Sequence, residues 1–203
     1  MSFYSSVKGL LRFLFLKTLT PATILQETEE FPEGPVALCV NHISALDVLQ
    51  LIPATPRKIR FMAKKELFRI PLVGSVIKAA GAFPVDRKNA DVSAVKNGMT
   101  VLKEGEVLGI FPQGTRCPGV HPASTRDKLR DGAVMMAHRT HATLLPAAIR
   151  MKKNRQRLFR KVTLIYGKPI PYEEYAPLID GKNYSAATNM LFDRICALYD
   201  SVQ

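Results

Sequence analysis

The sequence predicts an α/β fold, a mostly parallel or mixed sheet with helices on both faces. Short apolar runs that suit buried strands alternate along the chain with longer segments of helical periodicity. The strand-like runs, such as residues 36–40 (VALCV), are apolar throughout, which is typical of strands covered on both faces. The repeated strand–helix order favours a parallel sheet, because parallel strands need long crossover connections.

The N-terminal segment, residues 3–20, is rich in Leu and Phe and carries Lys8, Arg12 and Lys17. We expect it to form a short amphipathic helix that associates with a membrane by lying in the headgroup region. The alternative is an ordinary helix packed on the core. No run of 18 uncharged apolar residues occurs, so the sequence contains no clear transmembrane helix.

The remaining elements follow from periodicity and from residues that start or stop helices. Residues 21–35, rich in proline and glutamate, are expected to form a connector. Pro71 suits the first turn of a helix, and Gly105 ends another. Strands are expected at residues 36–40, 58–63, 82–85, 107–111, 143–149 and 161–170. Helices are expected at residues 45–52, 71–80, 90–104, 129–140 and 184–202.

The chain is strongly basic. Its 203 residues include 29 Lys and Arg against 17 Asp and Glu, a net charge of +12. Such a charge favours an anionic partner, such as membrane lipid, a phosphorylated substrate, an acidic carrier protein or nucleic acid. The basic stretch at residues 150–161 is either a solvated loop or a surface for anionic headgroups or an acidic acyl carrier. Nucleic acid is disfavoured there, because Phe159 is the only aromatic residue for base stacking.

Three polar clusters follow three of the expected strands. Asn41-His42 follows residues 36–40, Asp86-Arg87 follows residues 82–85, and Gln113-Gly114-Thr115-Arg116 follows residues 107–111. Ligands of open α/β sheets bind outside the carboxyl ends of the strands. The three clusters are therefore expected to converge on one pocket.

His42 and Asp47 suit general-base chemistry. Imidazole can take a proton from an attacking hydroxyl near neutral pH, and a carboxylate can fix its tautomer. A spacing of five would set the two side chains about 140° apart on a regular helix. They can meet only if His42 precedes the helix and Asp47 lies in its first turns. The alternative is a surface histidine and a helix-turn aspartate that make no contact.

Arg87 and Arg116 are candidates for holding a phosphate, because guanidinium binds phosphate in a planar, bidentate way. Gly114 lets the backbone approach a ligand, and Thr115 can donate a hydrogen bond. Alternatively, each arginine only solvates a loop. The chain has no GxSxG motif, and nothing in the sequence pairs Cys117 with a base, so no activated nucleophile is evident. The scattered cysteines and histidines predict neither a disulfide framework nor a metal site.

Taken together, these motifs resemble those of the glycerolipid acyltransferases, in particular the 1-acylglycerol-3-phosphate acyltransferases of the bacterial PlsC type. Asn41 to Asp47 looks like their NHxxxxD signature, and Gly81 to Arg87 resembles their second block. Phe111-Pro-Gln-Gly-Thr-Arg116 resembles the third block, usually FPEGTRS, and Leu145-Pro146-Ala147-Ala148 resembles the fourth. The four blocks occur in the expected order. This chain departs from the pattern by carrying Gln113 in place of Glu and Cys117 in place of Ser.

The resemblance implies direct acyl transfer from acyl-CoA or acyl carrier protein to the sn-2 hydroxyl of lysophosphatidic acid. It implies His42 as general base, Asp47 as its partner, and Arg87 with residues 113–116 as the acceptor-binding groups, with no metal and no cofactor. Residues 1–30 would be a membrane-associating segment and connector, and residues 31–203 the acyltransferase domain. The protein would lie on the cytoplasmic face of the membrane, as a peripheral or monotopic protein. It would have no nucleic-acid partner. Alternatives are another acceptor (glycerol 3-phosphate, a lysophospholipid or a lyso-ornithine lipid) or a non-enzymatic anionic-lipid binder.

Overall fold

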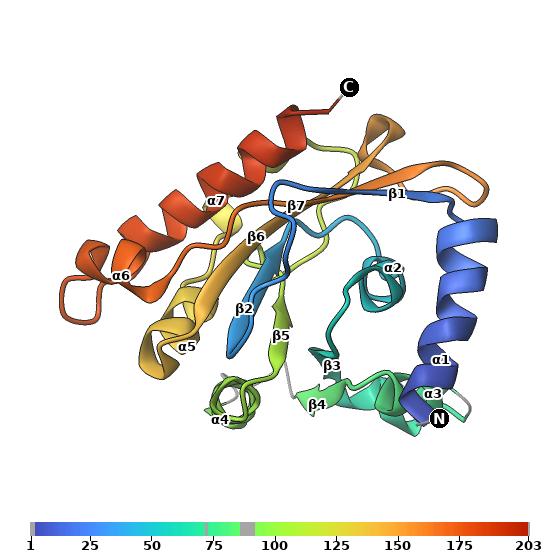
Figure 1. The fold of residues 1–203 in the computed structure, drawn as a ribbon, viewed down its shortest axis with the longest axis horizontal. Coiled ribbons are helices and arrows are strands. Elements are labelled where there is room, and N and C mark those ends of the chain that lie inside the picture. Colours follow the sequence, from blue (N-terminus) through green and yellow to red (C-terminus); the bar gives the residue numbers. More distant parts are fainter. Residues whose placement is uncertain (1–2, 72, 86–91, 203) are drawn as a thin grey trace.

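The computed structural model describes residues 3–71, 73–85 and 92–202. In these residues one mixed sheet has the strand order β1-β7-β6-β2-β5-β3-β4 (Figure 1). Strands β6 and β7 are antiparallel, and every other neighbouring pair is parallel. The strands are β1 (Ala22–Gln26), β2 (Val36–Val40), β3 (Ile59–Lys64), β4 (Phe83–Val85), β5 (Val107–Ile110), β6 (Thr143–Met151) and β7 (Val162–Tyr166).

Helices cover both faces of the sheet, as the apolar strands predict (Figure 1). One face is covered by α4 (Val92–Lys103), α5 (Gly132–Thr140) and α7 (Ser185–Asp200). The other face is covered by α1 (Phe3–Leu11), its π-helical continuation η1 (Arg12–Thr18) and α2 (Asp47–Ala54), with α3 (Val73–Ala79) beside α1. The short helices are α6 (Tyr172–Tyr175), η2 (Lys65–Arg69), η3 (Pro122–Lys128), η4 (Lys152–Asn154) and η5 (Ala176–Leu178).

Strand β2 lies in the middle of the sheet and shows why its sequence is apolar at every position. Ala37 and Cys39 belong to the core beneath α4, α5 and α7. Val36, Leu38 and Val40 belong to the core beneath α1 and α2. Successive residues of a strand face opposite sides of the sheet, and helices cover both sides here. All five side chains are therefore buried. His42 therefore lies two residues after a fully buried strand in the middle of the sheet.

The N-terminal segment is helical and is packed on the domain. Leu11 and Leu16 are buried in the core under α2. Lys8 donates from Nζ to the carbonyls of Thr55 (2.7 Å) and Pro56 (3.0 Å), where α2 ends. Cations at a helix C-terminus interact favourably with its free carbonyl groups. Within the part of the chain that the structure describes, no helix is long and apolar enough to cross a bilayer.

The structure corrects several details of the sequence-based expectation. Strand β7 ends at Tyr166 and not at residue 170, and helix α5 begins at Gly132 and not at residue 129. The connector contains strand β1, whose residues pair with β7 from Ala22↔Val162 to Gln26↔Tyr166. β1 is a partly exposed edge strand, so its sequence lacks the continuous apolar run that identified the others. Helix α2 was expected to end before Pro53 but includes it, because a proline in the last turn disrupts few hydrogen bonds.

Candidate active site

The turn between β2 and α2 is held in place by Asn41. Its side-chain amide donates to the carbonyl of Ile149 (3.0 Å), and its oxygen accepts from the N–H of Ile149 (2.8 Å). Both groups belong to the neighbouring strand β6, so Asn41 extends the β2–β6 pairing by one side chain. The end of β2 is thereby fixed before the chain reaches His42.

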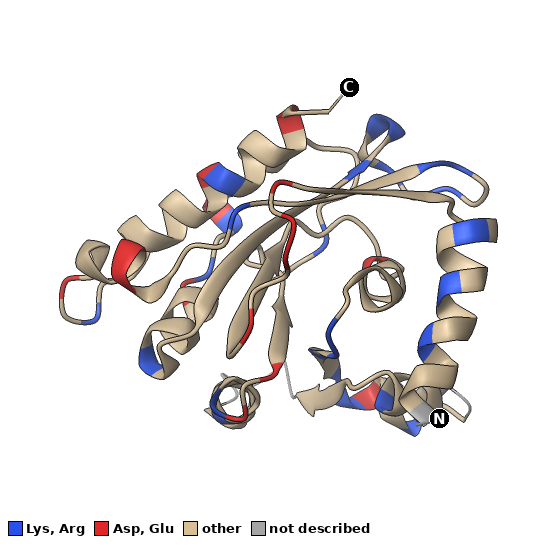
Figure 2. Ribbon diagram, viewed as in Figure 1, with Lys and Arg blue, Asp and Glu red and all other residues tan. Residues whose placement is uncertain are grey.

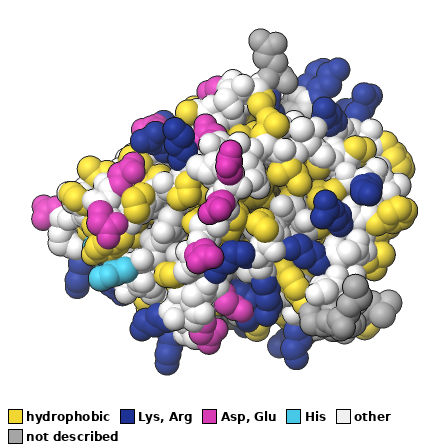
Figure 3. Space-filling view, in the orientation of Figure 1, with side chains coloured by type: hydrophobic (Ala, Val, Ile, Leu, Met, Phe, Trp, Pro, Cys, Tyr) yellow, Lys and Arg dark blue, Asp and Glu magenta, His cyan; other side chains and the backbone are white. Residues whose placement is uncertain are grey.

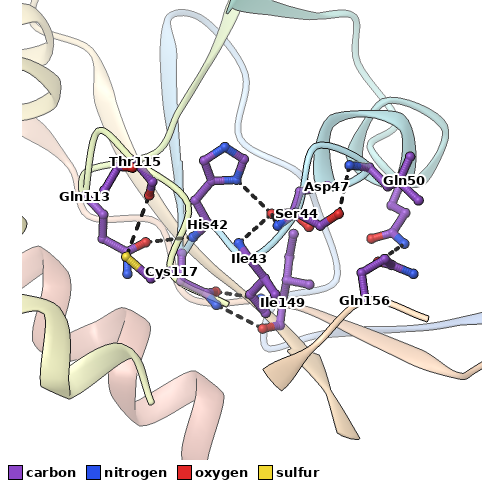
Figure 4. A network of polar contacts seen from close by, with 12 residues as sticks. His42, Ile43, Ser44, Asp47, Gln50, Gln113, Thr115, Cys117, Ile149 and Gln156 are labelled. Carbon is purple, nitrogen blue, oxygen red and sulfur yellow. Dashed lines mark hydrogen bonds and ion pairs between the residues drawn. The ribbon is translucent and has the colours of Figure 1, made fainter. Parts of the chain in front are cut away.

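His42 and Asp47 meet as the sequence requires, with His42 before helix α2 and Asp47 at its first residue. Nδ1 of His42 lies 2.8 Å from Oδ2 of Asp47 (Figure 4). The same oxygen accepts the main-chain N–H groups of Ile43 (2.7 Å) and Ser44 (2.8 Å). Asp47 is fully buried. Three donors on one carboxylate oxygen leave the aspartate a single orientation, and the imidazole is held with it.

The ring of His42 is also held by stacking. Its centroid lies 3.8 Å from that of Phe111, with an angle of 12° between the planes. Because a carboxylate only accepts hydrogen bonds, Nδ1 carries the proton, and Nε2 has the free electron pair. Figure 4 shows that Nε2 lies on the side of the ring away from Asp47. A histidine oriented in this way can take a proton from a hydroxyl group placed at Nε2.

The loop after β5 holds the backbone of His42. Oε1 of Gln113 accepts the main-chain N–H of His42 at 2.7 Å (Figure 4). Nε2 of Gln113 donates to Oγ1 of Thr125 at 2.7 Å. The N–H of Cys117 donates to the carbonyl of His42 at 2.8 Å. Gln113 is buried. Both main-chain polar groups of the histidine therefore bond to residues of one loop.

The rest of the third cluster is open to solvent. Gly114, Thr115 and Arg116 are exposed, and Gly114 has φ +65°, a left-handed conformation that disfavours other residues. The turn follows β5, which is parallel to β2, so it lies at the same edge of the sheet as His42. Arg87 lies outside the described residues. The thiol of Cys117 is buried, and its sulfur lies 3.8 Å from the carbonyl oxygen of Thr115 and 3.9 Å from Nζ of Lys128.

Sequence reasoning missed Gln50, which lies one turn after Asp47 on α2 and is fully buried. Its Nε2 donates to Oγ1 of Thr20 (3.1 Å) and to Oε1 of Gln156 (3.0 Å). It therefore links the helix of Asp47 to the residues just after the N-terminal helix and to the connection between β6 and β7. Figure 4 shows the second of these links. Its only signal in the sequence is a polar residue on the apolar face of a short helix. Among the described residues, no group of three or more His, Cys, Asp or Glu could hold a metal ion.

A profile of the family described as Acyltransferase matches residues 23–150, which contain the His42–Asp47 pair and the loop after β5. The chain belongs to the acyltransferase family. It is 39% identical over 165 residues to the 1-acyl-sn-glycerol-3-phosphate acyltransferase of Bacillus subtilis, covering 80% of this chain and 79% of the relative. It is 28% identical over 184 residues to the protein of that name from Streptococcus pneumoniae, covering 88% of this chain and 66% of the relative.

The fold of this acyltransferase is shared with a solved structure. The crystal structure of the 1-acyl-sn-glycerophosphate (LPA) acyltransferase PlsC from Thermotoga maritima superposes with a TM-score of 0.69. The two sequences are 21% identical, and the match covers 98% of this chain and 77% of that one. The matched region includes the N-terminal helix, which lies outside the segment matched by the family profile.

Proposed function

We propose that this acyltransferase transfers a fatty-acyl group from a thioester donor to the sn-2 hydroxyl of lysophosphatidic acid, forming phosphatidic acid. The observation that carries the proposal is the 2.8 Å contact between Nδ1 of His42 and Asp47, which leaves Nε2 for the substrate. The names of the relatives from Bacillus subtilis and Streptococcus pneumoniae support the choice of acceptor.

In the proposed reaction, Nε2 of His42 accepts the proton of the acceptor hydroxyl as its oxygen attacks the thioester carbonyl carbon. Asp47 stabilises the imidazolium that forms. The tetrahedral intermediate collapses, the carbon–sulfur bond breaks, and the ester remains. The leaving thiolate, whose conjugate thiol has a pKa of about 8–9, takes the proton back from Nε2. The histidine therefore returns to its starting state after each turnover.

We propose that Arg87, Thr115 and Arg116 bind the acceptor phosphate, with the Gly114 turn giving its backbone close approach. Contact between Gln113 and the acceptor glycerol stays a prediction. In the structure, the side-chain amide of Gln113 bonds to the main-chain N–H of His42 and to the hydroxyl of Thr125. The proposed donor is acyl-CoA or acyl carrier protein, because each carries its acyl group as a thioester.

We further propose that the protein works at the cytoplasmic face of the membrane, as a peripheral or monotopic protein. Two large apolar side chains of the N-terminal helix support this location, since Leu10 is 58% exposed and Phe13 is 60% exposed. The cations Arg12 and Lys17 are exposed beside them. An apolar surface with interspersed cations suits the headgroup region of an anionic bilayer.

The deciding experiment measures thiol release by the purified full chain from acyl-CoA and from acyl carrier protein. Release that depends on lysophosphatidic acid and yields phosphatidic acid is expected. A panel with glycerol 3-phosphate, lysophospholipids and a lyso-ornithine lipid tests the acceptor. Turnover only with one of these would replace the acceptor, and binding of anionic lipid with no thiol release under any condition would make the chain a lipid binder.

A further inference from the structure

The connection between β6 and β7, residues 152–161, lies at the edge of the sheet that carries His42. We name these residues the basic hairpin. Strand β6 is parallel to β2, so both strands end at the same edge, and the hairpin begins where β6 ends. The bond from Gln50 to Gln156 joins the hairpin to the helix of Asp47. Whatever binds the hairpin is therefore held beside the candidate active site.

The charge of the basic hairpin has one sign. Residues 150–161 contain no Asp or Glu. Figure 2 shows Lys and Arg along this connection and along the N-terminal helix formed by α1 and η1. The hairpin surrounds a pocket of about 250 Å³. Cations make up most of its lining, which consists of Met151, Lys152, Lys153, Arg155, Gln156, Arg157, Arg160, Lys161 and Val162. A pocket of this composition suits an anionic group such as a phosphate.

The tip of the basic hairpin is apolar. Leu158 is 54% exposed and Phe159 is 69% exposed, directly between Arg157 and Arg160. Phe159 has φ +59°, a left-handed conformation that is unfavourable for a bulky side chain. Such strain persists only where the surroundings maintain it, and it is common where proteins contact ligands. Here it accompanies an aromatic ring that faces solvent.

The tip lies against the N-terminal helix. The N–H of Phe159 donates to the carbonyl of Leu19 at 2.6 Å, just after η1 ends. The exposed side chains of Phe13 and Lys17 belong to that same η1 segment. In Figure 3, hydrophobic and basic side chains intermingle along the margin where Figure 1 places α1 and the hairpin. Two elements far apart in the sequence thus combine apolar and cationic groups in one region.

We infer that the basic hairpin docks on an anionic lipid bilayer, with its cations on the headgroup phosphates and Leu158 and Phe159 in the interface. An acidic carrier protein would also match the charge, but exposed apolar tips between cations suit a surface with apolar material beneath an anionic layer. The inference deepens the proposed function and rests on it, because a bilayer docked here presents a lipid acceptor at the edge that carries His42.

The test uses the full chain and vesicles of phosphatidylcholine with and without phosphatidylglycerol. We expect sedimentation with the anionic vesicles only, weakening as salt is added. Arg157→Ser with Arg160→Ser should lower vesicle affinity by more than about tenfold, from the loss of two surface cations. Leu158→Ser with Phe159→Ser should also weaken binding to the anionic vesicles. This loss of affinity should depend less on salt than the loss caused by the arginine substitutions. The matched control is Lys103→Ser with Arg139→Ser, two exposed cations at the opposite edge, where α4 and α5 end.

Activity assays separate this inference from the proposed function. With a short-chain acceptor dissolved as monomers, the hairpin variants should turn over like the wild type, whereas with acceptor in anionic vesicles they should be slow. Unchanged vesicle binding in both hairpin variants would overturn the inference. So would a loss of activity that occurs only with acyl carrier protein as the donor and does not depend on vesicles. If every protein were inactive while vesicle binding changed as expected, the docking surface would stand and the proposed function would fail.

Discussion

The main-chain N–H of His42 donates a 2.7 Å hydrogen bond to the side-chain oxygen of Gln113, 71 residues later in the chain. Together with the 2.8 Å contact from Nδ1 to Asp47, this bond fixes both the backbone and the ring of the histidine. Groups held in this way need little rearrangement before they react.

We predict that His42→Ala lowers kcat by about 10²–10⁴, the usual contribution of a general base. The fold should survive, because Asp47 keeps its bonds to the N–H groups of Ile43 and Ser44. Steady-state turnover, with circular dichroism as the control for folding, measures the effect. Turnover near that of the wild type in a folded variant would exclude His42 as the base.

We predict that Asp47→Asn lowers kcat by an amount similar to or smaller than that of His42→Ala. The amide oxygen can still accept from Ile43 and Ser44, but it lacks the charge that stabilises the imidazolium. Asp47→Ala should in addition lower stability by about 1–3 kcal/mol, since buried N–H donors lose their acceptor. Thermal unfolding of both variants separates the two effects. Equal activity of Asp47→Asn and wild type would show that the carboxylate charge has no part in catalysis.

We predict that Gln113→Glu keeps kcat within about tenfold of the wild type, or about 1.4 kcal/mol of barrier, and changes the acceptor KM. A glutamate oxygen can still accept the N–H of His42. The second oxygen of the glutamate cannot donate a hydrogen bond to Thr125, as the amide of Gln113 does. To donate to that oxygen instead, the hydroxyl of Thr125 would have to give up its 2.6 Å hydrogen bond to the carbonyl of Pro122.

Gln113→Ala removes both bonds of that side chain and is expected to lower kcat more than Gln113→Glu does. Kinetics of the two variants with lysophosphatidic acid, at equal folded fraction, test this difference. An inert wild type that gains turnover only as Gln113→Glu would contradict the proposed function and identify the chain as a lipid binder.

We predict that Arg116→Ala and Arg87→Ala raise the acceptor KM by about ten- to a hundredfold, since a lost charge-assisted hydrogen bond costs about 1.5–3 kcal/mol. The thioester KM should change little. In these variants, an acceptor without a phosphate should no longer be a poorer substrate than lysophosphatidic acid. Arg139→Ala, at the far edge of the sheet, is the matched control. A rise confined to the thioester KM would assign these arginines to the donor instead.

We predict that Leu10→Ser with Phe13→Ser weakens binding to anionic vesicles without lowering the melting temperature, because both side chains face solvent. Deletion of residues 1–20 is a poorer test, because it would also remove Leu11 and Leu16 from the core. Vesicle sedimentation and thermal unfolding check the pair. If vesicle binding persisted unchanged, the membrane contact of the protein would lie elsewhere, with the basic hairpin as the first region to examine.

The fold class, the buried central strands and the candidate His42–Asp47 pair could all be predicted from the sequence. These depend on local signals, namely apolar runs, helix periodicity and a five-residue spacing that works only where a strand gives way to a helix. Strand β1 and the exact end of α2 could not, because an exposed edge strand and a proline in a last turn leave weak or misleading local patterns.

Only the tertiary structure decided how distant segments meet around that pair. Asn41 bonds to Ile149 and Gln50 bonds to Gln156, each across more than a hundred residues, and no local pattern encodes such contacts. The hairpin reaches the active-site edge because β6 is parallel to β2 and antiparallel to β7. The sequence determines which groups are available, whereas the strand order and direction determine which of them lie together.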